Sequence, residues 1–363
     1  MKTLFHHEHG GARAGKERAE GREVLDFSVN ISPLVPPIGE LSFDDMQPRH
    51  YPSIDGRGVR RFYADKFELN PASVLPLNGA IEGIYLVPRA LCIRRLLLLS
   101  PSFYDYERAG RVAGAEISYI HLERENRFGL PGIEELAAAL AEADAFFAAN
   151  PNNPTGTKLP PEIIMALASR FPDKWFIVDE AFIQFTAAFP DNSLMGKVHA
   201  LKNVIVIHSL TKFYALPGLR LGAVVAHPEI IRHLLDYKEP WTVNSAAESV
   251  AVKLLECNGF DRELRELIFR ERTRVAAALS EIEGLHLYGG RANFFLAQWQ
   301  RGVSLDELLE YLRSVGIHVR DCRNFSGLEV NYFRFAIMLP EENNRLLAAV
   351  RGAAGLDREN CVD

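Results

Sequence analysis

One lysine, Lys212, stands in the run SLTKFYALPGLRLG at 209–222, where its neighbours are mostly hydroxyl, aromatic and aliphatic side chains. An apolar stretch typical of a buried strand precedes the run, so Lys212 lies about one turn past a strand end. Desolvation by Phe213 and Tyr214 would lower the pKa of the amine and free it as a nucleophile. The pattern therefore indicates a lysine that can form a Schiff base, and a surface lysine in a loop is the alternative.

A second ionisable residue, Asp179, ends the apolar run WFIVD at 175–179. An ionised carboxylate at the end of such a strand is costly unless a cation meets it. A protonated pyridine nitrogen would be a suitable cation, and the carboxylate would then keep the ring protonated as an electron sink. The alternative is an aspartate that caps the helix after the strand.

Further polar residues have the types that a phosphorylated ring compound needs. Asn153 in NPNNPTG precedes a proline, which holds it extended, so its amide could donate to a phenolate oxygen; a plain loop is the alternative. Ser209 stands three residues before Lys212, and Arg220 stands eight residues after it. The turn NGAIEG at 78–83 opens a predicted helix and supplies free backbone N–H groups. A hydroxyl, a guanidinium and these N–H groups together favour a phosphate site.

The order of the elements predicts an α/β fold with two domains. Short apolar runs alternate with helical patterns in the middle of the chain, which is typical of a mostly parallel sheet with crossover helices. Long amphipathic helices and further strands follow, as in an α+β domain. We expect a large domain at 39–245 and a small domain made of 1–38 and 246–363. Strands of the large domain are expected at 96–100, 116–120, 145–150, 175–180, 203–209 and 220–226.

Composition excludes several classes of partner. The formal net charge is -6, and the basic residues are scattered, so nucleic acid is not expected as a partner. The four cysteines lie far apart without a CxxC pair, which favours neither a disulfide framework nor a zinc site, and no metal is expected. No apolar run approaches the length of a membrane span. We expect a cytoplasmic protein that contacts no membrane.

Taken together, these motifs resemble the fold-type I pyridoxal-phosphate-dependent enzymes of the class I and II aminotransferase superfamily, over nearly the whole chain. The resemblance implies pyridoxal 5'-phosphate (PLP) as the cofactor, with Lys212 attached to it. It also implies that Asp179 pairs with the pyridine nitrogen and that Asn153 bonds the ring hydroxyl. Ser209 and Arg220 would bind the cofactor phosphate.

The same resemblance assigns the remaining cofactor contacts. Phe103 falls where the family stacks an aromatic ring on the cofactor, and Tyr51 matches a tyrosine that reaches the phosphate from the neighbouring subunit. A homodimer is therefore implied. Gly79, Ala80 and Ile81 occupy the phosphate-binding turn, where the family usually places hydroxyl residues. Only backbone donors remain at this turn.

Within the superfamily, the chain is most similar to the threonine-phosphate decarboxylases, which are relatives of the histidinol-phosphate aminotransferases. This likeness implies that Arg334 binds the substrate α-carboxylate with Asn30 nearby, while Arg320 and His9 hold the distal phosphate. The implied reaction is decarboxylation of L-threonine O-3-phosphate to aminopropanol phosphate for cobalamin biosynthesis. The likeness is carried by HGG at 9–11, DFSVNISPL at 26–34, DEAFIQF at 179–185 and VRDCRNFSGLEVNYFRFAI at 319–337.

Other functions stay open at this point. A histidinol-phosphate aminotransferase would use the same cofactor and the same pair of arginines, and no motif decides which bond at the α-carbon breaks. Ala80 and Ile81 motivate a non-catalytic binding module of the same fold. Phe182 and Met338 also depart from residues that are common in the superfamily. A nucleotide-binding α/β protein is disfavoured because no GxGxxG or GxxxxGK[ST] motif follows a strand.

Overall fold

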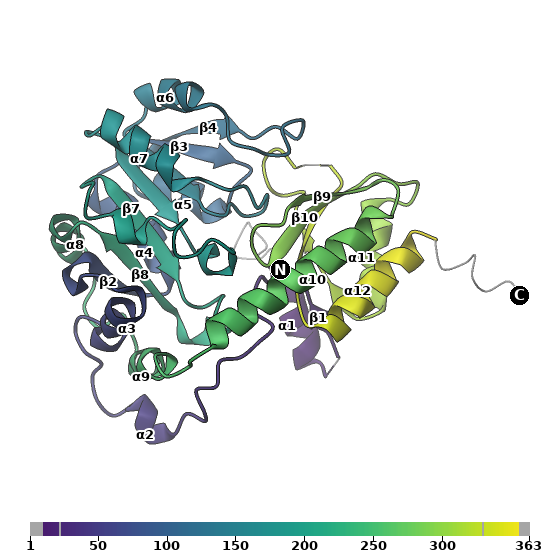
Figure 1. Cartoon of the computed structure of the whole chain (residues 1–363), viewed down its shortest axis with the longest axis horizontal. Coiled ribbons are helices and arrows are strands. Elements are labelled where there is room, and N and C mark those ends of the chain that lie inside the picture. Colours follow the sequence, from purple (N-terminus) through teal and green to yellow (C-terminus); the bar gives the residue numbers. More distant parts are fainter. Residues whose placement is uncertain (1–9, 22, 329, 356–363) are drawn as a thin grey trace, which may run out of the picture.

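The computed structural model describes residues 10–21, 23–328 and 330–355. Figure 1 shows a large sheet with helices on both faces, coloured purple to teal, beside a smaller sheet with long helices, coloured green to yellow. Helix α10 (Phe260–Ser280) runs from the large-sheet side to the smaller sheet. Among the described residues, no helix has the length and hydropathy that a bilayer crossing requires.

The large sheet has seven strands in the order β2-β8-β7-β6-β5-β3-β4. Strands β3 to β7 pair in parallel, whereas β8 is antiparallel to both β7 and β2. The predicted α/β class with a mostly parallel central sheet is therefore confirmed. The strands are β2 (Val74–Asn78), β3 (Arg95–Ser100), β4 (Glu116–His121), β5 (Ala145–Ala149), β6 (Trp175–Asp179), β7 (Val204–Ser209) and β8 (Leu221–Ala226).

Edge strand β2 is absent from the prediction, and its sequence VLPLN contains Pro76, a residue that is unusual inside a strand. At the sheet edge the missing N–H of a proline costs no ladder hydrogen bond on the open side, so the run is tolerated there. The strand matters for function because it leads directly into the turn at Asn78 and Gly79.

Helices cover both faces of the large sheet and bury two separate apolar cores. Neighbouring strand residues such as Phe146 and Phe147 point into opposite cores. One core takes residues from α4, α5 and α8, and the other takes residues from α3, α6, α7 and α9. The helices are α3 (Arg57–Phe67), α4 (Ala80–Ala90), α5 (Tyr104–Val112), α6 (Ile133–Ala141), α7 (Pro161–Arg170), α8 (Pro228–Leu235) and α9 (Ser245–Leu254).

The smaller sheet is antiparallel, in the order β12-β13-β10-β9. Strand β1 (Leu25–Asp26) pairs in parallel with β11 (Ile317–His318), which brings the N-terminal segment to this part of the chain. The neighbouring strands at 317–318 and 320–321 therefore belong to two different sheets. The remaining elements are α1 (Ala12–Ala19), α2 (Phe43–Met46), β9 (Leu285–Gly289), β10 (Phe294–Trp299), α11 (Leu305–Ser314), β12 (Arg320–Asp321), β13 (Tyr332–Ala336), α12 (Pro340–Ala353) and 3-10 helices at Pro71–Ser73, Ile183–Phe185, Met195–Lys197 and Pro217–Leu219.

The domain boundaries at 39 and 245 stay a prediction. Helix α9, just after the second boundary, packs against α3 on the large sheet. Near Lys212 the N-terminal segment also touches the large-sheet part, because the backbone N–H of Ser32 donates to the Lys212 carbonyl at 2.8 Å. The two parts of the chain thus meet at the lysine that the sequence singled out.

Candidate active site

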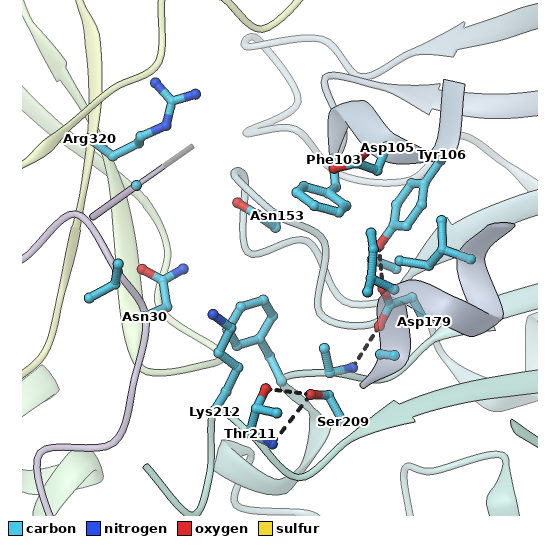
Figure 2. Close-up of a pocket in the computed structure, with 18 of the residues that line it drawn as sticks. Asn30, Phe103, Asp105, Tyr106, Asn153, Asp179, Ser209, Thr211, Lys212 and Arg320 are labelled. Atoms are coloured by element: carbon cyan, nitrogen blue, oxygen red, sulfur yellow. Dashed lines mark hydrogen bonds between the residues drawn. The ribbon is translucent and has the colours of Figure 1, made fainter. Parts of the chain in front are cut away.

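A pocket of about 550 Å³ lies where the two parts of the chain meet. Figure 2 shows Asp179, Ser209 and Phe103 on one side of it, and Asn30 and Arg320 on the other, with the Lys212 amine pointing into the space between. Most of the predicted site residues line this one pocket. They are Asn30, Ala80, Ile81, Phe103, Asn153, Asp179, Ser209, Lys212, Arg220, Arg320 and Arg334.

Three of these residues meet because they follow neighbouring parallel strands. Asp179 ends β6, Ser209 ends β7, and Asn153 follows β5. Ligands of open parallel sheets bind at the carboxyl ends of the strands, and the sequence prediction relied on this rule. The structure places Asn153, Asp179 and Ser209 in one pocket, as this rule predicts.

Lys212 has the electrostatic surroundings of a nucleophilic amine. Burial and, to a lesser extent, the nearby charges of Arg334 and Arg220 together lower the pKa of Lys212 to about 8. Phe213 and Tyr214 are both buried beside it, as expected. No carboxylate of the described residues forms an ion pair with Lys212. The amine is therefore available to a ligand.

Asp179 is buried, and burial raises its pKa to about 6. The carboxylate accepts a hydrogen bond from the Tyr106 hydroxyl at 2.8 Å and another from the backbone N–H of Ala181 at 2.8 Å. The second contact resembles the predicted capping role, although no α-helix starts there. Within the described chain, no Lys or Arg pairs with this carboxylate, so it remains able to meet a cation from a ligand.

Tyr106 is a site residue that sequence reasoning missed. It lies on the first turn of α5, three residues after Phe103, and the two rings pack edge to face with centroids 5.5 Å apart. Because its hydrogen bond crosses from α5 to the end of β6, only the three-dimensional packing reveals it. The run FYDY at 103–106 does place two aromatic residues three positions apart, but nothing in it points to Asp179.

The turn at 78–81 and the loop after β7 form a polar end of the pocket. Ser209 and Thr211 share a hydrogen bond between their hydroxyls of 2.7 Å, and Thr211 is a second residue that was missed. Gly79 adopts a φ of 77° before α4, and the Arg220 guanidinium lies where a β-carbon of residue 79 would be. Gly79 does not line the pocket, but it leaves the space that Arg220 occupies. Ala80 and Ile81 line the pocket at the helix start.

Two arginines enter the pocket from the smaller sheet, and Arg320 on β12 stands directly opposite Arg334 on β13. They are only 8% and 6% exposed. Arg334 donates to the Ser28 carbonyl at 2.8 Å and to the side-chain oxygen of Asn153, and burial lowers its pKa to about 10. Like charges facing each other across strands are destabilising. An anion between them would remove that cost.

Arg320 is held by several contacts of its own. Its guanidinium lies 5.3 Å from the centre of the Phe325 ring and donates to Asn324 at 3.0 Å. On the same side of the pocket, Asn30 is buried, and none of the described residues bonds either polar atom of its amide. A buried amide without partners is costly, which indicates that a polar ligand reaches it.

Besides Gly79, the predicted residue Tyr51 does not line this pocket. Tyr51 is 84% exposed and packs on Trp241, with ring centres 5.3 Å apart. Its predicted contact with a neighbouring subunit stays a prediction. His9 lies outside the described residues, and the adjacent Gly10 lines the pocket.

Residues 45–350 match the family described as aminotransferase class I and II. The chain belongs to this family. A threonine-phosphate decarboxylase of Salmonella typhimurium is 32% identical over 361 residues, which cover 96% of this chain and 97% of that protein.

Two solved structures extend the comparison. The histidinol-phosphate aminotransferase of Clostridium acetobutylicum has a TM-score of 0.84 at 28% identity, over 92% of this chain and 99% of that chain. The L-threonine-O-3-phosphate decarboxylase of Porphyromonas gingivalis has a TM-score of 0.79 at 26% identity, over 91% and 99%. The predicted superfamily is confirmed.

The pocket fits the cofactor of these aminotransferase-family enzymes, PLP. Among the described residues, the Lys212 amine has no carboxylate partner and the buried Asp179 carboxylate has no cationic partner. The pocket also offers Ser209 and Arg220 beside the start of a helix, where an anion is favoured. A carbonyl, a protonatable ring nitrogen and a phosphate match these three groups. The chain is a PLP-dependent enzyme, and the roles of its individual residues remain predictions.

Proposed function

We propose that this chain decarboxylates L-threonine O-3-phosphate to (R)-1-amino-2-propanol O-phosphate, a precursor in cobalamin biosynthesis. The observation that carries the proposal is the facing pair Arg320 and Arg334 in the pocket of Lys212. The substrate has two anionic ends, a carboxylate and a phosphate. A guanidinium binds either group through two parallel hydrogen bonds, so the pair matches both ends of one small molecule.

The side chains divide the work of this reaction. Arg334 would bind the α-carboxylate with Asn30 beside it, and Arg320 would hold the phosphate. When bound, PLP supplies the electron sink for the bond that breaks at the α-carbon. Asp179 would hold the proton on the ring nitrogen, and the Lys212 amine, which faces the pocket, would donate a proton to the α-carbon after carbon dioxide leaves.

The outcome depends on which substituent of the α-carbon is aligned for cleavage. A carboxylate that Arg334 aligns for cleavage would lead to decarboxylation. An aligned α-hydrogen leads instead to its removal by Lys212 and to transamination. The two arrangements differ by rotation about one bond. The groups that hold the carboxylate and the phosphate therefore determine which bond at the α-carbon breaks.

The second candidate function is a histidinol-phosphate aminotransferase. The structural similarity to the Clostridium acetobutylicum enzyme, with a TM-score of 0.84, favours it. Histidinol phosphate carries no carboxylate, so the buried Arg334 would have an anionic partner only during the half-reaction with an amino or oxo acid. Threonine phosphate gives both arginines a partner in one complex, which is why we favour decarboxylation.

A substrate panel with product identification separates the candidates. The purified enzyme with PLP is incubated with threonine phosphate alone, with serine phosphate alone, and with histidinol phosphate plus 2-oxoglutarate. Aminopropanol phosphate from the first incubation supports the proposal, and glutamate from the third alone contradicts it. Absence of all products, with a visible cofactor absorbance that Lys212→Ala leaves unchanged, would indicate a non-catalytic binding module.

We also propose that the enzyme is a homodimer in which Tyr51 reaches the phosphate end of the partner's site. The exposure of Tyr51 and its packing on the half-exposed Trp241 support this, because large exposed aromatic groups are common in interfaces. The spacing of the cysteines favours a reducing compartment, and we propose the cytoplasm. We further propose two domains, a large one at 39–245 and a small one made of 1–38 and 246–363.

A further inference from the structure

A carboxylate lies on the helix turn that is proposed to receive the cofactor phosphate. Glu82 is in the first turn of α4, and its Oε2 accepts a hydrogen bond of 2.5 Å from the backbone N–H of Asn78. This contact closes the turn between β2 and α4. Glu82 is therefore positioned by the same backbone that presents Ala80 and Ile81 to the pocket.

A lysine from a distant segment neutralises this carboxylate. The Lys238 ammonium lies 3.3 Å from Glu82 Oε1, and the two side chains are only 7% and 15% exposed. Thr242 links them, since its hydroxyl donates to Glu82 Oε2 at 3.2 Å and accepts a hydrogen bond from Lys238. Exposed ion pairs contribute little to stability, whereas a pair that is this well covered interacts strongly.

Charge balance matters at this turn because Ala80 and Ile81 lack hydroxyl groups. The first-turn backbone N–H groups and Arg220 then carry much of the attraction for a phosphate. An unneutralised carboxylate on the same turn would repel the phosphate dianion and would compete for the positive end of the helix. Lys238 removes most of that repulsion, and the contacts of Glu82 keep the turn in shape.

We propose that Lys238 is a positioning residue for the cofactor site: by neutralising Glu82, it makes the start of α4 receptive to the phosphate group of PLP. The proposal rests on the proposed function, since it concerns the same cofactor. It also assigns the segment 238–242 a part in cofactor affinity, although none of its residues lines the pocket.

The test measures the binding of PLP and of inorganic phosphate to enzyme freed of its cofactor. Lys238→Met should weaken both by about tenfold or more, because it leaves a covered charge unpaired. Lys238→Arg should restore most of the affinity. The matched control is Arg89→Met. It removes the ion pair between Arg89 on α4 and Glu239 in the same segment, in which the two side chains are 52% and 65% exposed. This control should bind like the wild type.

The double variant Lys238→Met/Glu82→Gln distinguishes charge from structure. If Lys238 acts by neutralising Glu82, the double variant binds phosphate more tightly than Lys238→Met alone. Equal weakening in the single and double variants would overturn the proposal. The variant Glu82→Gln provides a second measurement should Lys238→Met fail to fold. It removes the carboxylate charge from the turn and leaves the positive charge of Lys238 unopposed. It should bind inorganic phosphate more tightly than the wild type, and unchanged or weaker binding contradicts the proposal.

The same titrations separate this inference from the proposed function. A wild-type chain that binds neither PLP nor phosphate contradicts the cofactor site itself. A wild-type chain that binds both, while Lys238→Met matches Arg89→Met, contradicts only the role of Lys238.

Discussion

Lys212 and Asp179 lie in one pocket with opposite ordinary charges, yet neither pairs with the other. Burial lowers the pKa of the lysine to about 8 and raises that of the aspartate to about 6, so both titrate near neutral pH. Groups perturbed in this way by burial in a pocket are typical of functional sites. The facing Arg320 and Arg334 are a second unfavourable arrangement of charges. A ligand with anionic groups near the arginines and a cationic group near Asp179 would stabilise both arrangements.

The pKa of Lys212 predicts how cofactor capture depends on pH. The amine is protonated and unreactive below about pH 8, so the rate at which cofactor-free enzyme captures PLP should rise through this pH and then level off. The charge of Arg334 contributes to the lowered pKa. Arg334→Met should therefore move the midpoint to higher pH, as measured by absorbance in a stopped-flow experiment. An unchanged midpoint would contradict the assigned electrostatics. Arg351→Met serves as control, because Arg351 is partly exposed, pairs with Glu281 and does not line the pocket.

Arg320 should matter for the phosphorylated substrate and not for the cofactor. Arg320→Met is expected to lower kcat/KM for threonine phosphate by about a hundredfold, because charge-assisted hydrogen bonds to the phosphate are lost. The binding of PLP should stay within about threefold of the wild type, since Arg320 is assigned to the distal end of the substrate. The control is Arg323→Met, whose side chain pairs with Asp306 and Asp321. Equal losses in both variants would contradict the assignment.

The elements bring the site together through the ends of parallel strands and the start of one helix. Strands β6 and β7 end in the pocket, and α4 begins beside β8. Gly222 on β8 permits the close approach, because an added β-carbon would lie 2.7 Å from the Ala80 nitrogen and 2.8 Å from the His208 carbonyl oxygen. Both neighbours are backbone atoms that cannot move alone, so the start of α4 depends on a glycine.

Gly222→Ala tests this dependence. The β-carbon should push the start of α4 away from β8, weaken PLP binding at least about tenfold and cost about 1–3 kcal/mol of the free energy of unfolding. Gly218→Ala is the matched control in the same segment, because nothing lies within 4 Å of its added β-carbon. Cofactor titration and urea unfolding report the two effects. Wild-type affinity in Gly222→Ala would show that α4 tolerates displacement.

Across the whole molecule, the large sheet provides the predicted cofactor residues and the smaller sheet provides the predicted substrate arginines. Lys212 sits at their junction, tied to the N-terminal segment through Ser32. This arrangement makes substrate binding depend on how the two parts are held together. Figure 1 shows that α10 runs from one part to the other, so the helix is one of the connections between them.

Hybrid dimers test the proposed oligomer. Tyr51→Ala should weaken the phosphate end of the partner's site, and Lys212→Ala should inactivate its own site. If Tyr51 acts across the interface, a mixture of the two chains forms dimers with one intact site, and decarboxylation returns in part. A mixture of two differently tagged Lys212→Ala preparations should show no recovery. Failure of the first mixture, despite hybrid dimers detected by their tags, contradicts the shared site.

The sequence predicted the strand ends well because apolar runs followed by polar residues mark them locally. Lys212, Asp179 and Asn153 could be found in this way. Tyr106 could not, because its partner lies 73 positions further along the chain. The facing of Arg320 and Arg334 depends on strand register, which the intervening loop sets. Edge strand β2 could not be predicted, because a strand tolerates its proline only at the sheet edge, and the sequence does not show which strand lies at the edge.

The most direct test of the central claim is carbon dioxide release from threonine phosphate labelled in its carboxylate, with PLP present and no oxo acid. The wild type should release the label with formation of aminopropanol phosphate, and Lys212→Ala should be slower by at least about a thousandfold. Retention of the label by a wild-type enzyme that has bound PLP, together with amino transfer from histidinol phosphate to 2-oxoglutarate, would contradict the account.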